Sequence, residues 1–276
     1  MDHNDPSLAL GKKTTYTDQY DPALLYPIPR CHKRHELGLT DDLPFDGVDI
    51  WNAYELSWLS PSGKPVVAMG EFRVPCTSPK LIESKSLKLY LNSLNQSCFA
   101  DFATVGRTLA DDLSTAVEAP VEVKLFTVNE QTDHFTNQLP GDCIDDLDIS
   151  VDNYELNPSL LSEAANHDAI ITKTLHSHLL RSNCLITSQP DWGSIVIRYH
   201  GPRIDPEALL RYLISFRRHN EFHEQCIERI FCDLLHYCHP EQLTVYARYT
   251  RRGGLDINPF RSNFETTVAN LRLPRQ

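Results

Sequence analysis

The sequence lacks every segment that would place it in or across a membrane. Its apolar runs are only a few residues long, whereas a membrane-spanning helix needs about 20 residues. The first ten residues, MDHNDPSLAL, include two aspartates and no apolar run of the kind found in secretory signals. We therefore expect a cytoplasmic protein that has no membrane partner.

The common phosphate-binding and metal-binding signatures are also missing. None of the 11 glycines forms GxGxxG or GxxxxGKS/T, so the sequence gives no support for a Rossmann or P-loop site. CxxC, HExxH and GxSxG do not occur. The 8 cysteines have irregular spacings, and in a reducing compartment we expect most of them to be free thiols. We expect no bound metal ion.

The charge is acidic overall and unevenly distributed. A net charge of −11 argues against a protein that coats nucleic acid, because phosphate contacts need a basic face. Residues 129–168 contain ten acids and no Lys or Arg, which is typical of a solvated connection, and we expect one short strand around 149–154. Residues 240–276 carry six arginines against three acids, which favours either a local anion site or a solubilising surface.

The first half of the chain has the pattern of a hairpin followed by two helices. With 276 residues, 41% of them hydrophobic, a large core is available. Alternating apolar and polar residues over 49–58 and 65–75 flank a turn at 60–63, which predicts a β-hairpin. A strand is predicted over 121–128. The two helices between them have these apolar stripes: Leu87, Tyr90, Leu91 and Leu94, then Phe102, Val105, Leu109 and Leu113.

The second half repeats this order without detectable sequence identity. Strands are predicted within 169–187 and over 194–200, around a turn at 189–193, and again from about 243 onward. Asp205 and Pro206 predict the cap and first turn of a helix. Its inward residues are Leu209, Leu213 and Phe216, and those of the next helix are Ile227, Ile230, Phe231, Leu234 and Leu235. Both halves therefore predict an α+β fold in which two helices cover one face of an antiparallel sheet.

Two carboxylates extend the apolar faces of helices at their starts. Glu83 lies four residues before Leu87, while His223 and Glu224 precede Ile227 by four and three residues. A buried carboxylate is costly without partners, so such a pair favours a polar ligand that donates N–H groups. The alternative is that each glutamate only caps its own helix, and Ser78 and Ser84 are further candidate caps for the first.

A cysteine near a strand end is the candidate nucleophile. Cys184 lies in SNCLIT, and Asp191 follows seven residues later in the predicted turn. A thiol nucleophile needs a nearby group that transfers protons, which a carboxyl across a hairpin could supply. The alternative is an inert core thiol, because free cysteine is among the most buried residue types.

Several segments together resemble one enzyme family. They are ESKSLKLY over 83–90, FHEQCIERI over 222–230 and RRGGLDINPFRSN from Arg251, together with Cys184 and Asp191. They resemble the NADPH-dependent 7-cyano-7-deazaguanine reductases, the nitrile reductases of queuosine biosynthesis, in their long two-module form. The octapeptide separates this family from relatives in the tunnelling fold such as the GTP cyclohydrolases. The resemblance extends over nearly the whole chain from YPIPR at Tyr26.

The resemblance implies a fold, a reaction and a set of roles. The fold would be two tandem tunnelling-fold (T-fold) modules, over 26–156 and 157–276, after an extension over 1–25, in a homodimer. Two NADPH would reduce 7-cyano-7-deazaguanine to 7-aminomethyl-7-deazaguanine through a thioimide on Cys184, with Asp191 as the proton donor. The residues that hold the substrate would be Ile82, Glu83, Ser84, His223 and Glu224. Those that contact NADPH would be Ser84, Lys85, Arg252 and Gly253, and the cofactor phosphates make Arg251 and Arg261 further candidates.

Two other functions stay open on the sequence. A related transferase would use the same thioimide but let ammonia attack a nitrile carried on tRNA, which the lysines of the octapeptide and the acidic charge disfavour. A non-catalytic purine- or pterin-binding T-fold module would keep Cys184 only as a core residue. We expect a small deazapurine substrate and no direct nucleic-acid partner.

Overall fold

The chain forms two compact units. The computed structural model describes residues 16–40, 42–130, 136 and 138–276. Unit 1 comprises Met1–Glu36, Val48–Asp133 and Arg251–Ile257, and unit 2 comprises Leu37–Gly47, His134–Thr250 and Asn258–Gln276. The main division therefore falls at residues 133 and 134, with one short segment from each half assigned to the other unit. The predicted module boundary at 156 and 157 stays a prediction.

The sheet of unit 1 is built on a long hairpin. Strands β2 (Asp46–Leu59) and β3 (Pro65–Pro75) pair antiparallel, and β5 (Glu122–Thr127) pairs with the other edge of β3. In the turn, the Ser60 N–H donates to the carbonyl of Lys64, and Gly63 takes a φ of 78°, a value that favours glycine. The predicted hairpin at this position is confirmed.

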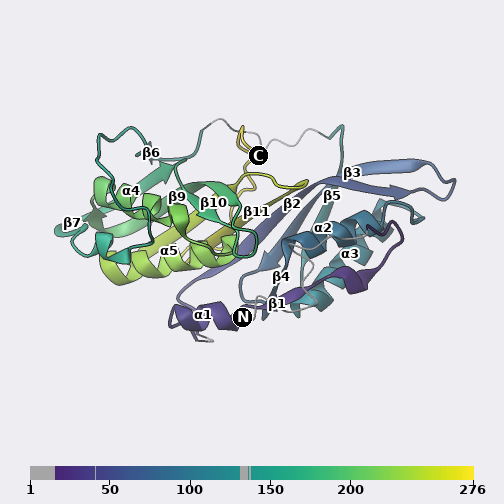
Figure 1. Ribbon diagram of the computed structural model, residues 1–276, viewed down its shortest axis with the longest axis horizontal. Coiled ribbons are helices and arrows are strands. Elements are labelled where there is room, and N and C mark those ends of the chain that lie inside the picture. Colours follow the sequence, from purple (N-terminus) through teal and green to yellow (C-terminus); the bar gives the residue numbers. More distant parts are fainter. Residues whose placement is uncertain (1–15, 41, 131–135, 137) are drawn as a thin grey trace. The chain divides into compact units, whose positions relative to one another are not determined.

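Two helices cover one face of this sheet. Helices α2 (Ser84–Ser93) and α3 (Phe102–Val117) lie side by side against it (Figure 1). Their predicted stripes are buried against strand residues such as Trp51 and Phe72. Asp101 caps α3 by accepting the Thr104 N–H at 2.7 Å. A short pair, β1 (Pro27–Pro29) and β4 (Lys80–Ile82), leads into α2, and η1 (Pro22–Leu24) and α1 (Cys31–Glu36) flank β1.

The sheet of unit 2 is built on three long strands. β9 (Pro190–Ile204) pairs antiparallel with β7 (Ala165–Ser177) and with β10 (Gln242–Tyr249), which in turn pairs with β11 (Leu255–Ser262). The first three residues of β11 belong to unit 1. Two short strands complete the set, β6 (Asp142–Cys143) on β7 and β8 (Arg181–Asn183) on the start of β9.

Two helices again cover one face. α4 (Pro206–Ser215) and α5 (His223–Cys238) lie side by side on the sheet of unit 2 (Figure 1), with η2 (Pro158–Leu161) and η3 (Phe216–Arg218) beside α4. Asp205 caps α4 and Pro206 opens it, as predicted. The Tyr212 hydroxyl of α4 donates to Asp233 of α5 at 2.6 Å, which ties the two helices together. The predicted α+β class, with two helices on one face of each sheet, is confirmed.

Two local predictions are wrong. Residues 190–193 are not a turn but the start of β9, because Asp191 and Trp192 pair with Ser182 and Arg181 of β8. The turn lies earlier, between Asn183 and Pro190. No strand forms over 149–154, and the short strand in this acidic stretch is β6. The turn was misplaced because β8 is only three residues long, too short for its alternation to be seen in the sequence. Residues 149–154 are in no strand pair of the described structure.

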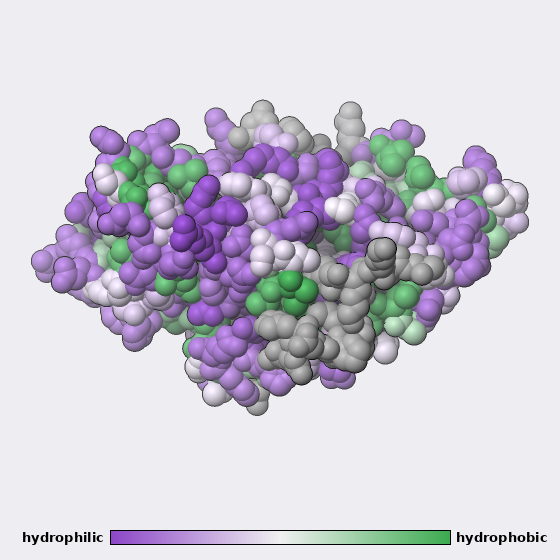
Figure 2. Space-filling view, in the orientation of Figure 1, coloured by the Kyte–Doolittle hydropathy of each residue, from purple (hydrophilic) through white to green (hydrophobic). Residues whose placement is uncertain are grey.

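The surface agrees with the polar composition. Figure 2 shows hydrophilic side chains over most of the drawn face, with apolar side chains in separate patches. Among the described residues, no helix has both the length and the apolar character needed to cross a bilayer.

Candidate active site

The candidate nucleophile lies at the closed end of the β8–β9 hairpin in unit 2. The Cys184 N–H donates to the carbonyl of Gln189 at 2.8 Å, and the Ser188 N–H donates to the carbonyl of Cys184 at 3.0 Å. Ser188 has a φ of 53°, a left-handed conformation that lets the chain reverse direction in this turn. Cys184 is a buried free thiol, with 9% of the residue exposed.

Asp191 lies on the opposite strand of the same hairpin. It pairs with Ser182, two residues before Cys184. Side chains alternate along a strand, and directly opposed residues share a face, so Ser182, Cys184 and Asp191 belong to one face of the hairpin. The sequence prediction of a thiol and a carboxyl across a turn therefore agrees with this placement, although Asp191 is in the strand.

Helix α5 adds an imidazole to this pair. His223, its first residue, places Nε2 3.3 Å from Oδ2 of Asp191, and the two side chains are only 12% and 4% exposed. His223 Nδ1 is buried and has no hydrogen-bond partner among the described residues. An orphaned polar atom in a buried position is costly, so it marks a place where a ligand can bind.

The segment before α5 holds the helix start against the hairpin. The Asn183 N–H donates to the carbonyl of His219 at 2.8 Å, and the Glu221 N–H donates to the carbonyl of Asn183 at 3.0 Å. The Asn220 side chain donates to the Ser188 hydroxyl at 2.9 Å, which braces the turn from outside. These bonds hold the start of α5, which carries His223, against the end of the hairpin that carries Cys184.

Glu221 anchors this segment to the body of α5. Its carboxylate accepts two hydrogen bonds from Arg229, at 2.7 and 3.0 Å, and it lies 3.0 Å from His219 Nε2. Burial by itself would raise the pKa of Glu221, but the bonds from His219 and Arg229 outweigh it and lower the pKa overall. Glu221 is therefore a structural carboxylate. Glu224, in the first turn of α5, is also buried, at 2% exposure.

In unit 1, Glu83 is the N-cap of α2. Its two carboxylate oxygens accept the backbone N–H groups of Lys85 and Ser86, at 2.8 and 2.7 Å. Burial raises the pKa of Glu83, and those two hydrogen bonds only partly oppose the rise. Glu83 therefore caps its own helix, and its further role as a ligand acceptor stays a prediction. Capping leaves further lone pairs on the carboxylate, so the same group can still accept hydrogen bonds from a ligand.

The segment around Tyr26 fixes the start of α2. The Glu83 N–H donates to the carbonyl of Tyr26 at 2.9 Å, and the Tyr26 N–H donates to the Ser86 hydroxyl at 3.0 Å. Ile82, at the end of β4, pairs with Pro27 and is 3% exposed. Ser84 and Lys85 are half-buried in the first turn of the helix.

The remaining cofactor candidates lie in a tight turn of unit 1. Arg252 and Leu255 exchange backbone hydrogen bonds of 2.8 and 3.2 Å around two glycines. Gly253 and Gly254 have φ values of 59° and 81°, the signature of a type I′ turn. Lys88 of α2 donates to the carbonyl of Gly253. The turn and the lysine-bearing helix are therefore in contact, which brings Gly253 to the same helix as Ser84 and Lys85.

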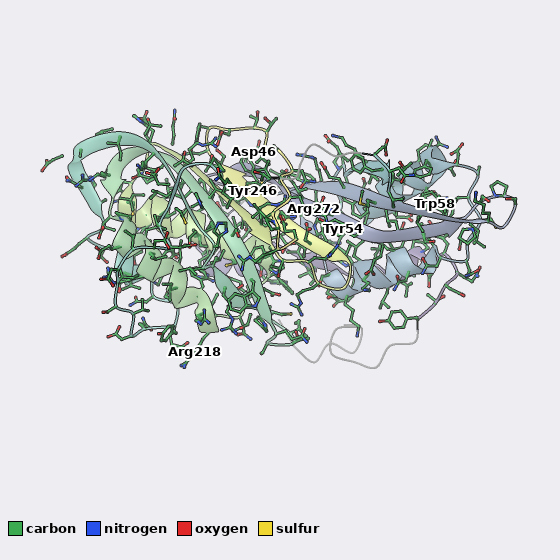
Figure 3. All side chains as sticks on the ribbon, turned by 90° about the horizontal axis from the view of Figure 1, so that it is seen from above. Asp46, Tyr54, Trp58, Arg218, Tyr246 and Arg272 are labelled. Atoms are coloured by element: carbon green, nitrogen blue, oxygen red, sulfur yellow. The ribbon has the colours of Figure 1, made fainter. Side chains whose placement is uncertain are left out.

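Of the two further arginines that the sequence suggested, one is exposed and one is buried. Arg251 is exposed, and its guanidinium stacks 4.8 Å from the ring centre of Tyr54 on β2, which Figure 3 labels. Arg261 is fully buried, at 0% exposure, and pairs with Glu228 at 2.8 Å. Its charge is paired inside the core of unit 2, so Arg261 is not available to bind a phosphate.

Two residues close to the candidate groups were missed from the sequence. Lys88 was hidden because it is one of several lysines on a helix face. Tyr249, whose ring stacks on His223, was hidden because it continues the apolar alternation of β10. All eight cysteines are free thiols. Within the described part of the chain, no three His, Cys, Asp or Glu side chains are grouped to hold a metal ion.

Comparison with known proteins identifies the family. A family described as "Nitrile reductase, 7-cyano-7-deazaguanine-reductase N-term" matches residues 16–125, and one described as "QueF-like protein" matches residues 190–267. The chain is 56% identical over 262 residues to the NADPH-dependent 7-cyano-7-deazaguanine reductase of Azoarcus sp. (strain BH72), covering 95% of this chain and 92% of that relative. The chain belongs to the 7-cyano-7-deazaguanine reductase family.

Membership in the 7-cyano-7-deazaguanine reductase family confirms the resemblance stated from the octapeptide. The two matched regions also agree with the two-module T-fold organisation, since one lies in each half of the chain. The enzyme class and the NADPH dependence that were expected agree with the name of the Azoarcus relative. The individual roles of Cys184, Asp191 and the binding residues stay predictions.

Proposed function

We propose that this chain is an NADPH-dependent oxidoreductase that reduces the nitrile of 7-cyano-7-deazaguanine to the aminomethyl group of 7-aminomethyl-7-deazaguanine, a step of queuosine biosynthesis. One observation carries the proposal. A hairpin and a helix start gather a thiol, a carboxyl and an imidazole, Cys184, Asp191 and His223, in a chain that is 56% identical to a reductase of that name.

Cys184 converts the nitrile into a group that can be reduced. Its sulfur forms a bond to the nitrile carbon while one π bond of the triple bond breaks, and the nitrogen gains a proton from Asp191. Asp191 is restored by the proton that leaves the thiol, so that in net terms S–H adds across the triple bond to give a thioimide. Covalent catalysis of this kind splits one difficult step into easier ones. The carbon–sulfur bond breaks after the first reduction and returns the thiol.

His223 and the two glutamates bind the deazapurine. A guanine-like ring presents adjacent N–H donors, which a fixed carboxylate such as Glu83 or Glu224 accepts. Ligand N–H groups favour the charged form of Glu83, whose pKa burial raises. A ligand without those donors would leave buried acceptors unpaired, which gives selectivity. Ile82 and Ser84 flank Glu83 and complete this set, and the orphaned Nδ1 of His223 is a further contact.

The residues of unit 1 fit an anionic dinucleotide. Ser84 and Lys85 open α2, Lys88 contacts the Gly253 carbonyl, and Arg252 begins the two-glycine turn. A Cβ at Gly253 would lie 3.1 Å from the Lys88 ammonium. Glycine at this position therefore leaves room beside the basic side chains for a ligand phosphate. NADPH, when bound, supplies hydride, and two hydrides with two protons convert a nitrile to an aminomethyl group. Cations and exposed backbone provide the phosphate contacts that a Rossmann loop would otherwise supply.

We further infer a cytoplasmic homodimer that has a small-molecule substrate and no direct nucleic-acid partner. The acidic charge of −11 supports the absence of a nucleic-acid surface, because such surfaces need clustered cations. Sedimentation of the purified chain tests the assembly, because the measured mass should be that of two chains and a single-chain mass would contradict the dimer.

A stoichiometry assay tests the proposed reaction. Purified protein is mixed with a limiting amount of the nitrile and excess NADPH, and the loss of reduced-nicotinamide absorbance is followed to completion. We expect two NADPH consumed per nitrile and an aminomethyl product. Binding of the nitrile without NADPH loss would instead indicate a non-catalytic purine-binding module. Ammonia-dependent consumption of a tRNA-borne nitrile would indicate the transferase.

A further inference from the structure

Tyr249 packs flat against the imidazole of His223. The two ring centres are 3.8 Å apart and the ring planes are inclined by only 8°. Tyr249 is the last residue of β10 and is fully buried, at 0% exposure. His223 therefore has one face on an immobile ring and one edge toward Asp191.

The Tyr249 side chain is enclosed on its remaining sides. Its hydroxyl lies in a buried group with the thiol of Cys226 and the hydroxyl of Ser182. Ser182 is the residue that pairs with Asp191, so the ring of Tyr249 spans from the hairpin to the start of α5. The ring cannot turn without displacing these groups, because protein interiors are close-packed.

The backbone of Tyr249 is held by two amide side chains. Its N–H donates to Asn258 Oδ1 at 3.1 Å, and its carbonyl accepts from Gln276 Nε2 at 3.0 Å. Gln276 Nε2 also donates to Asn258 Oδ1 at 2.9 Å, and Gln276 Oε1 accepts from Arg248 at 3.0 Å. The register between β10 and β11 runs over Thr244–Tyr246, so these amides take over where that ladder ends. We call Asn258 and Gln276 the amide clamp.

We propose that Tyr249, held by the amide clamp, is a positioning residue for His223 in the reaction. Stacking fixes the plane of the imidazole, and that plane decides whether Nε2 points to Asp191 and Nδ1 to the ligand. Free rotation of His223 would break both contacts at once, because the two nitrogens lie on one rigid ring. This inference rests on the proposed nitrile reduction and adds a residue that acts on it only through His223.

The test compares ring removal with ring retention. Tyr249→Leu removes the aromatic face, whereas Tyr249→Phe keeps it and loses only the hydroxyl. Tyr199→Leu is the control, since Tyr199 is a tyrosine of the neighbouring strand β9 at 1% exposure. Its hydroxyl accepts the Ile204 N–H at 3.0 Å, at the opposite end of β9 from Asp191. Each variant is measured for thermal stability, for kcat and KM of both substrates, and for the rate of adduct formation with the nitrile alone.

We expect Tyr249→Leu to slow adduct formation and kcat by about 10- to 100-fold while the KM for NADPH is unchanged. A tilted His223 would misplace both the bound nitrile and the Asp191 carboxyl, and misplacement of this kind costs about that much. Tyr249→Phe should restore most of the rate, and Tyr199→Leu should lose stability without losing rate. Equal rates in Tyr249→Leu and the wild type would overturn the inference, as would a Tyr249→Phe variant as slow as Tyr249→Leu. If the wild type itself formed no adduct, the proposed reaction would fail instead.

A clamp variant keeps the test decisive if Tyr249→Leu does not fold. Gln276→Glu preserves the acceptor for Arg248 but replaces the amide donor to Asn258 and to the Tyr249 carbonyl with a carboxylate. We expect slower adduct formation by several-fold with unchanged NADPH affinity. An unchanged rate in folded Gln276→Glu would contradict the role of the clamp.

Discussion

Glu83 caps the helix that carries Lys85, and its Oε1 accepts the Lys85 backbone N–H at 2.8 Å. One residue proposed to bind the deazapurine thus fixes the geometry of one proposed to bind NADPH. The coupling is local, since only Ser84 lies between Glu83 and Lys85 along the chain. Substitutions at the start of α2 should therefore alter the binding of both the deazapurine and NADPH.

Asp191→Asn should bind the nitrile and reduce it slowly. The amide has nearly the same shape but cannot deliver a proton, so we expect kcat to fall by about 10²- to 10⁴-fold, the usual contribution of general acid catalysis. Ligand affinity should change little. Steady-state kinetics with a separate binding titration checks this, and full activity in the variant would remove Asp191 from the mechanism.

Glu83 should make stability depend on pH. Because burial raises its pKa, the folded protein binds the proton more tightly than the unfolded chain. The contribution of Glu83 to the free energy of unfolding should then fall as pH rises from about 4.3, the usual glutamate pKa, through the raised folded-state value, and stay level above it. Glu83→Gln removes this titration. Urea unfolding over a pH series should show the stability of Glu83→Gln relative to wild type increasing across that window, and a constant difference would contradict the account.

Lys85→Ala should weaken NADPH binding selectively. Removing a cation beside the cofactor phosphates should raise the dissociation constant of NADPH by about tenfold, as expected for one charge-assisted contact. The control is Lys80→Ala, because Lys80 is in the same unit and pairs with Glu118 on the surface. Fluorescence titration of bound NADPH measures both variants. Equal affinities in the two variants would place the phosphates elsewhere.

Glu228→Ala should strongly destabilise unit 2. Glu228 and Arg261 are 1% and 0% exposed, and the variant removes the carboxylate that accepts two hydrogen bonds from the Arg261 guanidinium, at 2.8 and 3.2 Å. Breaking a buried pair of this kind costs about 3–5 kcal/mol. Glu155→Ala is the control, since Glu155 meets Arg218 with both side chains 68% exposed and should cost about 0–1 kcal/mol. Urea denaturation of both variants gives the two values, and similar losses would contradict the burial of the Arg261 pair.

Much of the fold could be predicted from the sequence because apolar residues recur with a regular period along its long helices and strands. The 60–63 turn between two alternating strands and the Asp205–Pro206 helix start are local signals that later packing did not override. The β8–β9 hairpin was misplaced by several residues, because β8 is only three residues long. Short strands are defined by their partners and not by their own pattern.

The site was predictable only where a residue type carried the chemistry. Glu83 stood out as a carboxylate that extends an apolar helix face, and Cys184 and Asp191 as a thiol and a carboxyl on either side of a predicted turn. The resemblance gave all three their roles. Tyr249 could not be found this way, because its contact with His223 depends on where α5 meets the end of β10. Arg261 was misjudged because its partner Glu228 lies 33 residues away, in another element.

The measurement that tests the central claim most directly is a mass spectrum of the intact protein incubated with 7-cyano-7-deazaguanine in the absence of NADPH. If Cys184 attacks the nitrile, the protein mass should rise by the full mass of one ligand, and the increase should vanish in Cys184→Ala. A wild-type protein that gains no mass, or a Cys184→Ala variant that still does, would contradict the account.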